Sequence, residues 1–452
     1  MKQLCEVKSC NIQRVSNYKW SEAMANYRFL SNPRVTEHEL IEKIRSTTKK
    51  LVTGRRVLAI HDTSEINIIN HLNRIDDFEG IGCGTNEKCL GFFVHPILLY
   101  DIDTQAPIGL GNIHLFNRQI AYEKKMRPNY VDPIEDKESD KWYTPNLQAR
   151  DEVLNESKQI VYVSDRESDI YEVLASLPND KTDIIVRSKS NRKIGDNEHS
   201  ATKIEEYLNK SKSQHKIEFY HDFKVNGIHK RKLIKASIKF GEVKLKRPDK
   251  SIHLKNYEDE IKYNLVEVKQ IGNSQNKAQR INWILLTTLN VKNIEEALEV
   301  VGFYKKRWNI EKFFRLMKSE GFNIEQTELE KGSSIRKLTI MIMEASMLIL
   351  KLKSGRSVES AIRLIECFDE SQIQCLEGLN RKLEGNTDKQ KNPYSIESLS
   401  YASWIIARLG GWMGYQSQRP PGTITFKKGL ESFCAIYIGY SIANPQHDVY
   451  KR

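Results

Sequence analysis

The chain has 452 residues and a formal net charge of +12, because 71 lysines and arginines outnumber 59 aspartates and glutamates. This length indicates two to four structural parts, and a mean hydropathy of −0.56 with 39% hydrophobic residues is that of a soluble protein with a real core. The basic surplus favours a polyanionic partner, nucleic acid first and an acidic membrane surface second.

Simple sequence patterns argue against a secreted protein, a membrane protein and a zinc protein. The first 20 residues lack the apolar segment of a signal peptide. The longest apolar run, at 338–352, is interrupted by Glu344 and is too short to span a bilayer. The seven cysteines show no C-x-x-C spacing, and Cys83 and Cys89 have no histidines at metal-ligand spacing. We therefore expect a reduced, cytoplasmic chain with no membrane segment and no zinc site.

The amino-terminal half alternates between helix and strand patterns. Residues 20–50 read as helices interrupted at the Asn32-Pro33 turn. Apolar runs then predict strands, and a hairpin or meander is expected between the first two because a Gly/Cys loop separates them. The predicted strands lie in RRVLAIHDTSEINI (55–68), FFVHPILLYDID (92–103), the start of 159–176 and KTDIIVRSKSN (181–191).

The pattern changes twice in the rest of the chain. From about residue 191 to 284, alternating lysine-rich segments such as HKIEFYHDFKV and INWILLTTL predict an antiparallel β region. From residue 293 to about 412 the chain reads as helical, with a buried helix at 338–352 and a linker at 383–395. The tail predicts turns followed by a short helix.

Two aspartates end predicted strands, and each has a structural and a chemical interpretation. Asp62 follows the apolar run VLAIH, where it is either a turn or N-cap residue or a metal ligand at a strand tip. In VYVSDRESDIYEVLAS (161–176), Ser164 and Glu167 fit an S-x-x-E capping box, and Asp165 would complement the helix dipole. Capping does not require Asp165, so a metal-ligand role stays open for it.

A predicted helix at 304–318 carries five polar residues along one stripe. At about 100° per residue this stripe is roughly 80° wide. It is either a solvated face, with an Arg307–Glu311 pair worth a few tenths of a kcal/mol, or a set of phosphate contacts beside a metal ligand. The second interpretation rests on the preference of hard cations for carboxylate oxygens. The five residues are Tyr304, Arg307, Glu311, Arg315 and Lys318.

Trp283, in INWILLTTL, has the pattern of a core or sheet-face aromatic residue. The alternative is a stacking surface, because aromatic rings stack on displaced bases with little sequence preference. The pattern by itself favours the core residue.

Together these segments resemble a known family. LAIHDTSE, YVSDRESDIY and FYKKRWNIEKFFRLMK resemble the three acidic motifs of DDE transposases from bacterial insertion sequences. More narrowly, Y-x-x-R-x-x-x-E-x-x-x-x-x-x-K resembles the signature of the IS-four family, which includes the Tn-five transposase. NYRFLSNPRV (26–35) and GGWMGYQSQRPPG (410–422) resemble further segments of these transposases. The signature residues are Tyr304, Arg307, Glu311 and Lys318.

The resemblance implies an α/β, RNase H-like catalytic domain, in which a mixed sheet flanked by helices brings distant carboxylates together. It implies that Asp62, Asp165 and Glu311 form a catalytic triad that holds two Mg²⁺ (or Mn²⁺) ions. The phosphate-holding residues would be Tyr304, Arg307 and Lys318, further contacts to the element's end would come from Arg187 and Arg315, and the base-stacking residue would be Trp283.

The implied function is cut-and-paste transposition by a homodimer in a synaptic complex. The enzyme would nick double-stranded DNA at inverted-repeat ends and transfer the freed strand into target DNA. The alternatives are a metal-dependent nuclease without strand transfer and a catalytically silent DNA-binding regulator. The expected parts are an N-terminal helical DNA-contacting region (1–50), a catalytic domain in two pieces (51–190 and 285–370), a β-strand insertion between them (191–284) and a C-terminal helical region for dimerisation (371–452).

Overall fold

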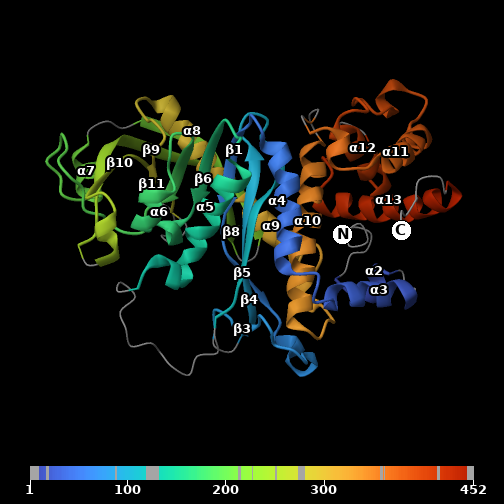
Figure 1. The fold of residues 1–452 in the computed structure, drawn as a ribbon. Coiled ribbons are helices and arrows are strands. Elements are labelled where there is room, and N and C mark those ends of the chain that lie inside the picture. The colour runs from blue at the N-terminus through green and yellow to red at the C-terminus, as the bar shows by residue number, and fades with distance from the viewer. Residues whose placement is uncertain are drawn as a thin grey trace. The chain divides into compact units, whose positions relative to one another are not determined.

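The chain forms two compact units, one made of residues 1–56, 63–123 and 309–452 and the other of residues 57–62 and 124–308. We call them the first and the second unit, and Figure 1 labels their helices and strands. The computed structural model describes residues 10–16, 20–86, 89–118, 132–211, 215–225, 228–249, 252–272, 280–356, 360, 362–414 and 418–444.

The second unit is built on a mixed sheet in the order β1-β6-β7-β11-β10-β9-β8. β6 and β7 are parallel, whereas β7, β11, β10, β9 and β8 pair antiparallel in that sequence. β6 is almost entirely buried, as expected of a parallel strand covered on both faces. The strands are β1 (Arg56–His61), β6 (Gln159–Ser164), β7 (Thr182–Arg187), β8 (His215–Val225), β9 (Ile228–Lys246), β10 (Glu260–Gln270) and β11 (Asn282–Thr287).

Helices of the second unit precede β6, connect β6 to β7 and β7 to β8, and follow β11. The longest is α8, which contacts β6 and β10. Its N-cap residue Asn293 accepts a hydrogen bond from the backbone of Glu296, which satisfies one of the donors at the helix start. The helices are α5 (Thr144–Gln148), α6 (Tyr171–Ser176), α7 (Ile204–Lys210) and α8 (Ile294–Lys306).

The first unit contains a smaller antiparallel arrangement around β4, in which every residue is buried. The strands β2, β3 and β5 all pair antiparallel with β4. Two helices, α4 and α10, pack against β5, and α4 begins with a complete Thr36–Glu39 capping box. The elements are α4 (Glu37–Val52), β2 (Ser64–Asn67), β3 (Gly82–Cys83), β4 (Leu90–Asp101), β5 (Pro107–Phe116) and α10 (Gly332–Ser354).

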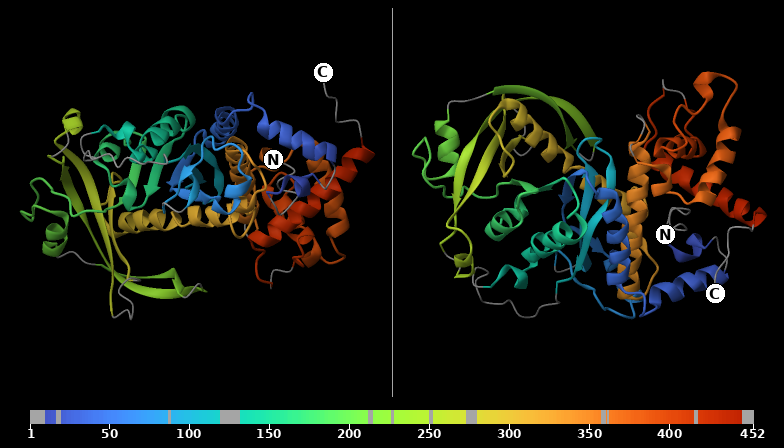
Figure 2. Two further views of the ribbon diagram at one scale, coloured as in Figure 1. Left: turned by 90° about the horizontal axis from the view of Figure 1, so that it is seen from below. Right: turned by 45° about the horizontal axis from the view of Figure 1, so that its top comes forward.

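Helix α10 is the centre of the helical part of this unit. It is buried over most of its surface, as expected of a helix that is apolar on all sides. In both views of Figure 2, the helices α11, α12 and α13 gather beside it, in agreement with their mutual contacts. The remaining helices are α2 (Ile12–Val15), α3 (Trp20–Ser31), α9 (Asn309–Met317), α11 (Glu370–Leu383), α12 (Leu399–Leu409) and α13 (Thr423–Ala443). Of the described helices, none is both long enough and apolar enough to cross a bilayer.

Most predicted elements are confirmed: the strands that end before Asp62 and Asp165, the antiparallel region, the buried helix at 338–352 and the helical carboxyl-terminal part. The tail helix was predicted as short, and this is wrong. Helix α13 has 21 residues because Phe426, Leu430 and Phe433 continue its buried face.

The predicted single helix at 304–318 is also wrong. α8 ends at Lys306 and α9 begins at Asn309. The amides of Arg307 and Trp308 donate to the carbonyls three residues earlier, which tightens the last turn of α8. The chain then passes from the second unit to the first between Trp308 and Asn309. The polar stripe is therefore divided between two helices.

Candidate active site

Two aspartates directly follow neighbouring buried strands, and both contact the guanidinium of Arg307. Asp62 directly follows β1 and Asp165 directly follows β6. Arg307 places Nη1 2.9 Å from Asp62 Oδ2 and Nη2 3.6 Å from Asp165 Oδ2. The side chain of Arg307 is only 9% exposed, so the ion pair with Asp62 lies largely out of water, where charge pairs are strongest.

Tyr304 and Arg187 complete the polar surroundings of Asp165. The Tyr304 hydroxyl donates to Asp165 Oδ1 at 3.2 Å, and Arg187 Nη1 lies 3.8 Å from the same oxygen. Burial, and secondarily the charge of Asp165, raise the pKa of Tyr304 to about 12. The hydroxyl therefore stays protonated at neutral pH and acts as a donor. Asp165 thus receives contacts from residues of β7, α8 and the turn after α8.

Trp283 lies on β11 and packs edge-on against Tyr304, with ring centroids 5.2 Å apart. A second aromatic neighbour, Phe219 of β8, lies at 6.1 Å. Trp283 is 7% exposed. The indole is therefore a sheet-face aromatic residue that also supports the tyrosine of the site, and its base-stacking role stays a prediction.

His61 anchors the end of β1, and the sequence interpretation assigned it no role. The ring is buried, lies edge-on to Trp142 and Tyr162, and its Nδ1 is 3.3 Å from Asn146 Nδ2. Burial lowers the pKa of His61 to about 3, so the ring is neutral at physiological pH. The available signal was a polar residue inside an otherwise apolar strand, directly before Asp62.

The predicted capping box at Ser164 and Glu167 is wrong. The Ser164 hydroxyl is buried and bonds the hydroxyl of Ser168. A 3₁₀ turn over Arg166–Ser168 follows, and helix α6 begins only at Tyr171. Glu167 lies 3.4 Å from Lys141 and its side chain is 67% exposed. The turn after β6 is therefore held by a serine pair.

Asp169 has a structural role. Its carboxylate accepts from Arg192 Nε and from the backbone amide of Lys189, both at 2.7 Å. Ser188 donates a further, longer bond. These contacts fix the loop that follows β7, so both carboxylate oxygens of Asp169 are used in stabilising the fold.

The other predicted site residues lie on the first unit. Glu311 is in the first turn of α9, and its convergence with the two aspartates stays a prediction. Arg315 lies 3.2 Å from Glu320. Lys318, just after α9, donates to the backbone carbonyl of Glu65 and lies 3.1 Å from Glu325.

The chemistry of Asp62 and Asp165 suits a hard divalent cation, because carboxylate oxygens are the ligands that Mg²⁺ and Mn²⁺ prefer. In the part of the chain that the structure describes, no group of three or more His, Cys, Asp or Glu side chains is arranged around one point. The two carboxylates instead face Arg307, whose charge balances theirs. The donor set therefore fits a divalent ion, and an arginine provides the positive charge in this conformation.

A family model described as a transposase DDE domain matches residues 111–348, just over half of the chain. The matched range includes Asp165, Trp283, Tyr304, Arg307 and Glu311. The mixed sheet and the helices that flank it agree with the RNase H-like fold of such a domain. This confirms the predicted fold class. Proteins with this domain act in DNA transposition and generally depend on divalent cations. The chain therefore belongs to the transposase DDE domain family.

Proposed function

We propose that the chain is a cut-and-paste transposase of the IS-four family, which nicks the ends of its own element and joins them to target DNA. The observation that supports this most is the cluster of Asp62 and Asp165 around Arg307, with Tyr304 bonded to Asp165. Tyrosine and arginine are the first two residues of the family signature. Tyr304 contacts Asp165 and Arg307 contacts Asp62, two acids that lie outside the signature. An active site built from these motifs would need such contacts.

The three acids would be the ligands of the divalent ions, Asp62 and Asp165 from the second unit and Glu311 from α9. Mg²⁺ or Mn²⁺ held there would lower the pKa of the attacking water or 3′-hydroxyl and stabilise charge on the phosphate.

The chain's own donors would position the scissile phosphate. Arg307 presents a planar fork of N–H donors that matches two phosphate oxygens. Tyr304 keeps its proton because its pKa is raised, so it would donate to a third acceptor. Lys318 adds a point charge after α9. Arg307 contacts the carboxylates of Asp62 and Asp165. When metal ions bind these carboxylates, the guanidinium would leave them and bind the phosphate instead.

Trp283 would stack on a base displaced from the duplex beside the cleavage site. Its edge-on contact with Tyr304 would couple that base to the residue that holds the phosphate. A homodimer would bring two element ends together before cleavage.

The test is strand transfer with DNA taken from the sequence flanking this open reading frame. Wild-type protein, Mg²⁺ and a pre-cleaved end should give joined products, and Asp165→Asn should lower the yield at least about 100-fold, since even groups behind metal ligands have effects of 10- to 100-fold. Glu167→Gln is the matched control, because Glu167 is exposed and should leave joining unchanged.

Each alternative predicts a different product. Cleavage without joining would favour the nuclease, and binding without either reaction would favour the silent regulator. If Asp165→Asn joins DNA as well as wild type, the assignment of the acids fails. Light scattering with and without end DNA tests the dimer, which should form on the DNA.

A further inference from the structure

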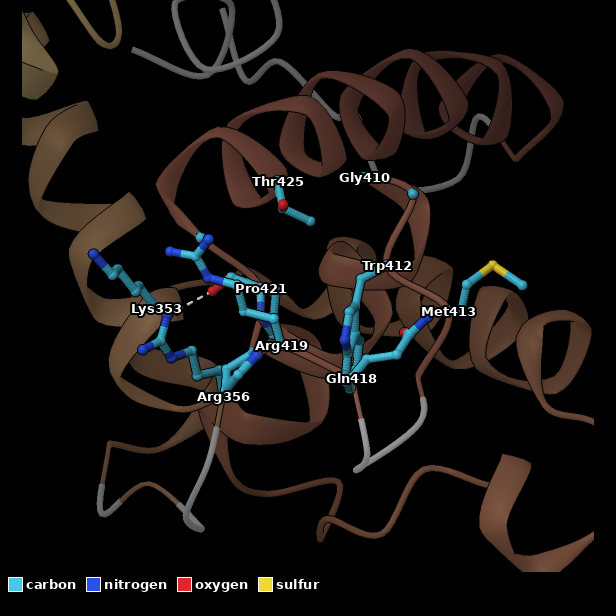
Figure 3. Close-up of a pocket in the computed structure, with 12 residues that line it drawn as sticks. Lys353, Arg356, Gly410, Trp412, Met413, Gln418, Arg419, Pro421 and Thr425 are labelled. Carbon is cyan, nitrogen blue, oxygen red and sulfur yellow. Dashed lines mark hydrogen bonds between the residues drawn. The ribbon is translucent and has the colours of Figure 1, made fainter.

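The first unit holds a cavity of about 720 Å³ outside the residues assigned to the active site. Its wall is formed by the end of α10, the turn after α12 and the segment that leads into α13. Figure 3 shows Lys353 and Arg356 on one side and Trp412 across from them. Most of the lining comes from residues 410–413 and 418–422, to which the proposed reaction assigns no role.

The lining of the cavity is positively charged. Its lining includes Lys353, Arg356 and Arg419, and no aspartate or glutamate. Among the residues that the structure describes, none of these three cations forms an ion pair with a carboxylate. Burial, then the neighbouring Arg356, lowers the pKa of Lys353, and burial, then Arg419, lowers the pKa of Arg356. An anion in the cavity would relieve this repulsion.

Hydrogen-bonding groups hold the cations on the cavity wall. Arg356 Nη1 donates to the carbonyl of Pro421 at 2.6 Å, and Lys353 Nζ donates to Thr423 Oγ1 at 3.2 Å. Proline fixes the backbone of the Pro420-Pro421 pair before α13, and Gly411 has a φ of +92°, which favours glycine. The cavity is therefore a built feature of the fold.

Two groups of further donors face the same region. Helix α13 has 21 residues, and its N-cap Gly422 provides no side-chain cap and its first turn no acid, so the first amides remain available to an anion. The indole Nε1 of Trp412 is buried and has no acceptor among the described residues. The cations, the helix start and this unpaired N–H together specify an acceptor-rich, negatively charged ligand.

We propose that this cavity binds the phosphodiester backbone of a DNA strand, through residues other than those assigned to the proposed active site. The inference rests on DNA being the partner under the proposed function. A volume of about 720 Å³ is far more than one phosphate needs, and cations beside an aromatic side chain that is partly exposed, as Trp412 is, are the combination that holds a nucleic-acid backbone with its bases. The strand is either the element's own end or the target.

Gly422 offers a test that separates charge from folding. Its φ and ψ are −92° and 178°, and an added Cβ would meet no atom within 4 Å. Asp and Asn are about equally good N-cap residues. Gly422→Asp and Gly422→Asn should therefore both fold, as thermal unfolding would verify, and they differ only in placing a negative charge at the cavity.

Binding is measured without Mg²⁺, so the result does not depend on catalysis. The probes are a duplex containing the element end and a duplex of unrelated sequence. Gly422→Asp should weaken one of them by about tenfold or more while Gly422→Asn binds like wild type. Arg419→Gln should lower the slope of log K against log salt by about 0.9, the value for one phosphate contact.

The pattern of loss identifies the strand. Weaker binding to the end duplex assigns the cavity to the element, and weaker binding only to unrelated duplex assigns it to the target. Equal affinities for Gly422→Asp and Gly422→Asn would overturn the proposal, as would a change in the oligomeric state without DNA, which would mark a protein contact. DNA binding through the cavity by a wild-type protein that never joins ends would overturn the proposed function alone.

Discussion

Replacing Arg307 by methionine is the sharpest perturbation of the candidate site. Methionine keeps much of the side-chain length and removes the charge. Asp62 then loses a partner at 2.9 Å, and Asp165 loses the nearer of its two cations. The two carboxylates would then lack their shared cation, while Arg187 would still lie 3.8 Å from Asp165.

The expected cost follows from the burial of this pair. Breaking a fully buried ion pair costs about 3–5 kcal/mol, but the side chains of Asp62 and Asp165 are 26% and 31% exposed and keep part of their hydration. We therefore expect a loss of about 2–3 kcal/mol. For a domain of this size that lowers the unfolding temperature by about 4–10 °C. The control is Arg315→Met, since the Arg315–Glu320 pair is more than one third exposed on both sides and should cost less than about 1 kcal/mol.

A double-mutant cycle with Asp62→Asn isolates the interaction. Thermal unfolding of the wild type, both single variants and the double variant should give a coupling of about 1–2 kcal/mol between the two positions. Mg²⁺ should stabilise Arg307→Met more than the wild type, because the cation replaces the missing charge. A coupling below about 0.5 kcal/mol would refute the argument that one guanidinium holds the two acids together.

Three further outcomes are expected from the same geometry. His61 takes up a proton near pH 6.5 in the unfolded chain but only near pH 3 in the folded chain. The free energy of unfolding of the wild type should therefore fall by up to about 1.4 kcal/mol per pH unit as the pH drops below about 6.5. His61→Gln should flatten this slope in thermal unfolding measured across pH 4–8. Asp169→Asn should destabilise by about 2–4 kcal/mol in denaturant titrations, since it leaves Arg192 buried without its carboxylate; stability within 0.5 kcal/mol of wild type would contradict its structural role. Glu311→Gln should abolish joining while the affinity for end DNA stays within about threefold of wild type, as gel-shift titration would show, and retained joining would remove Glu311 from the proposed triad.

Strand positions were predictable from the sequence because buried strands leave a strong apolar signal. The runs before Asp62 and Asp165 required no tertiary information, and the structure places β1 and β6 there. The lysine-rich alternation likewise identified the antiparallel strands β8 to β11. In each case the pattern of one segment sufficed, because burial of that segment is set by its own side chains.

The helix break at Arg307 could not be predicted in the same way. Residues 294–317 keep a helical pattern throughout, and Tyr304, Arg307 and Glu311 fit one face of a continuous helix. At the break, Arg307 pairs with an aspartate 245 positions away, a tertiary contact that no local pattern contains. The capping prediction failed for a local reason. The buried Ser164 hydroxyl bonds that of Ser168, four residues later, and helix α6 begins only at Tyr171.

Asp165 and Asp169 show how burial separates a structural carboxylate from an available one. They lie four positions apart in the same short segment, and composition treats them alike. The Asp169 side chain is fully buried, and each carboxylate oxygen accepts a bond at 2.7 Å from a group in the loop that follows β7. Asp165 is about one third exposed, and its partners Tyr304, Arg307 and Arg187 come from elsewhere in the chain. Because its carboxylate is partly exposed, Asp165 can exchange a partner for a metal or a phosphate at lower cost than the fully buried Asp169. Of the two aspartates, only Asp165 therefore has the physical properties of a ligand.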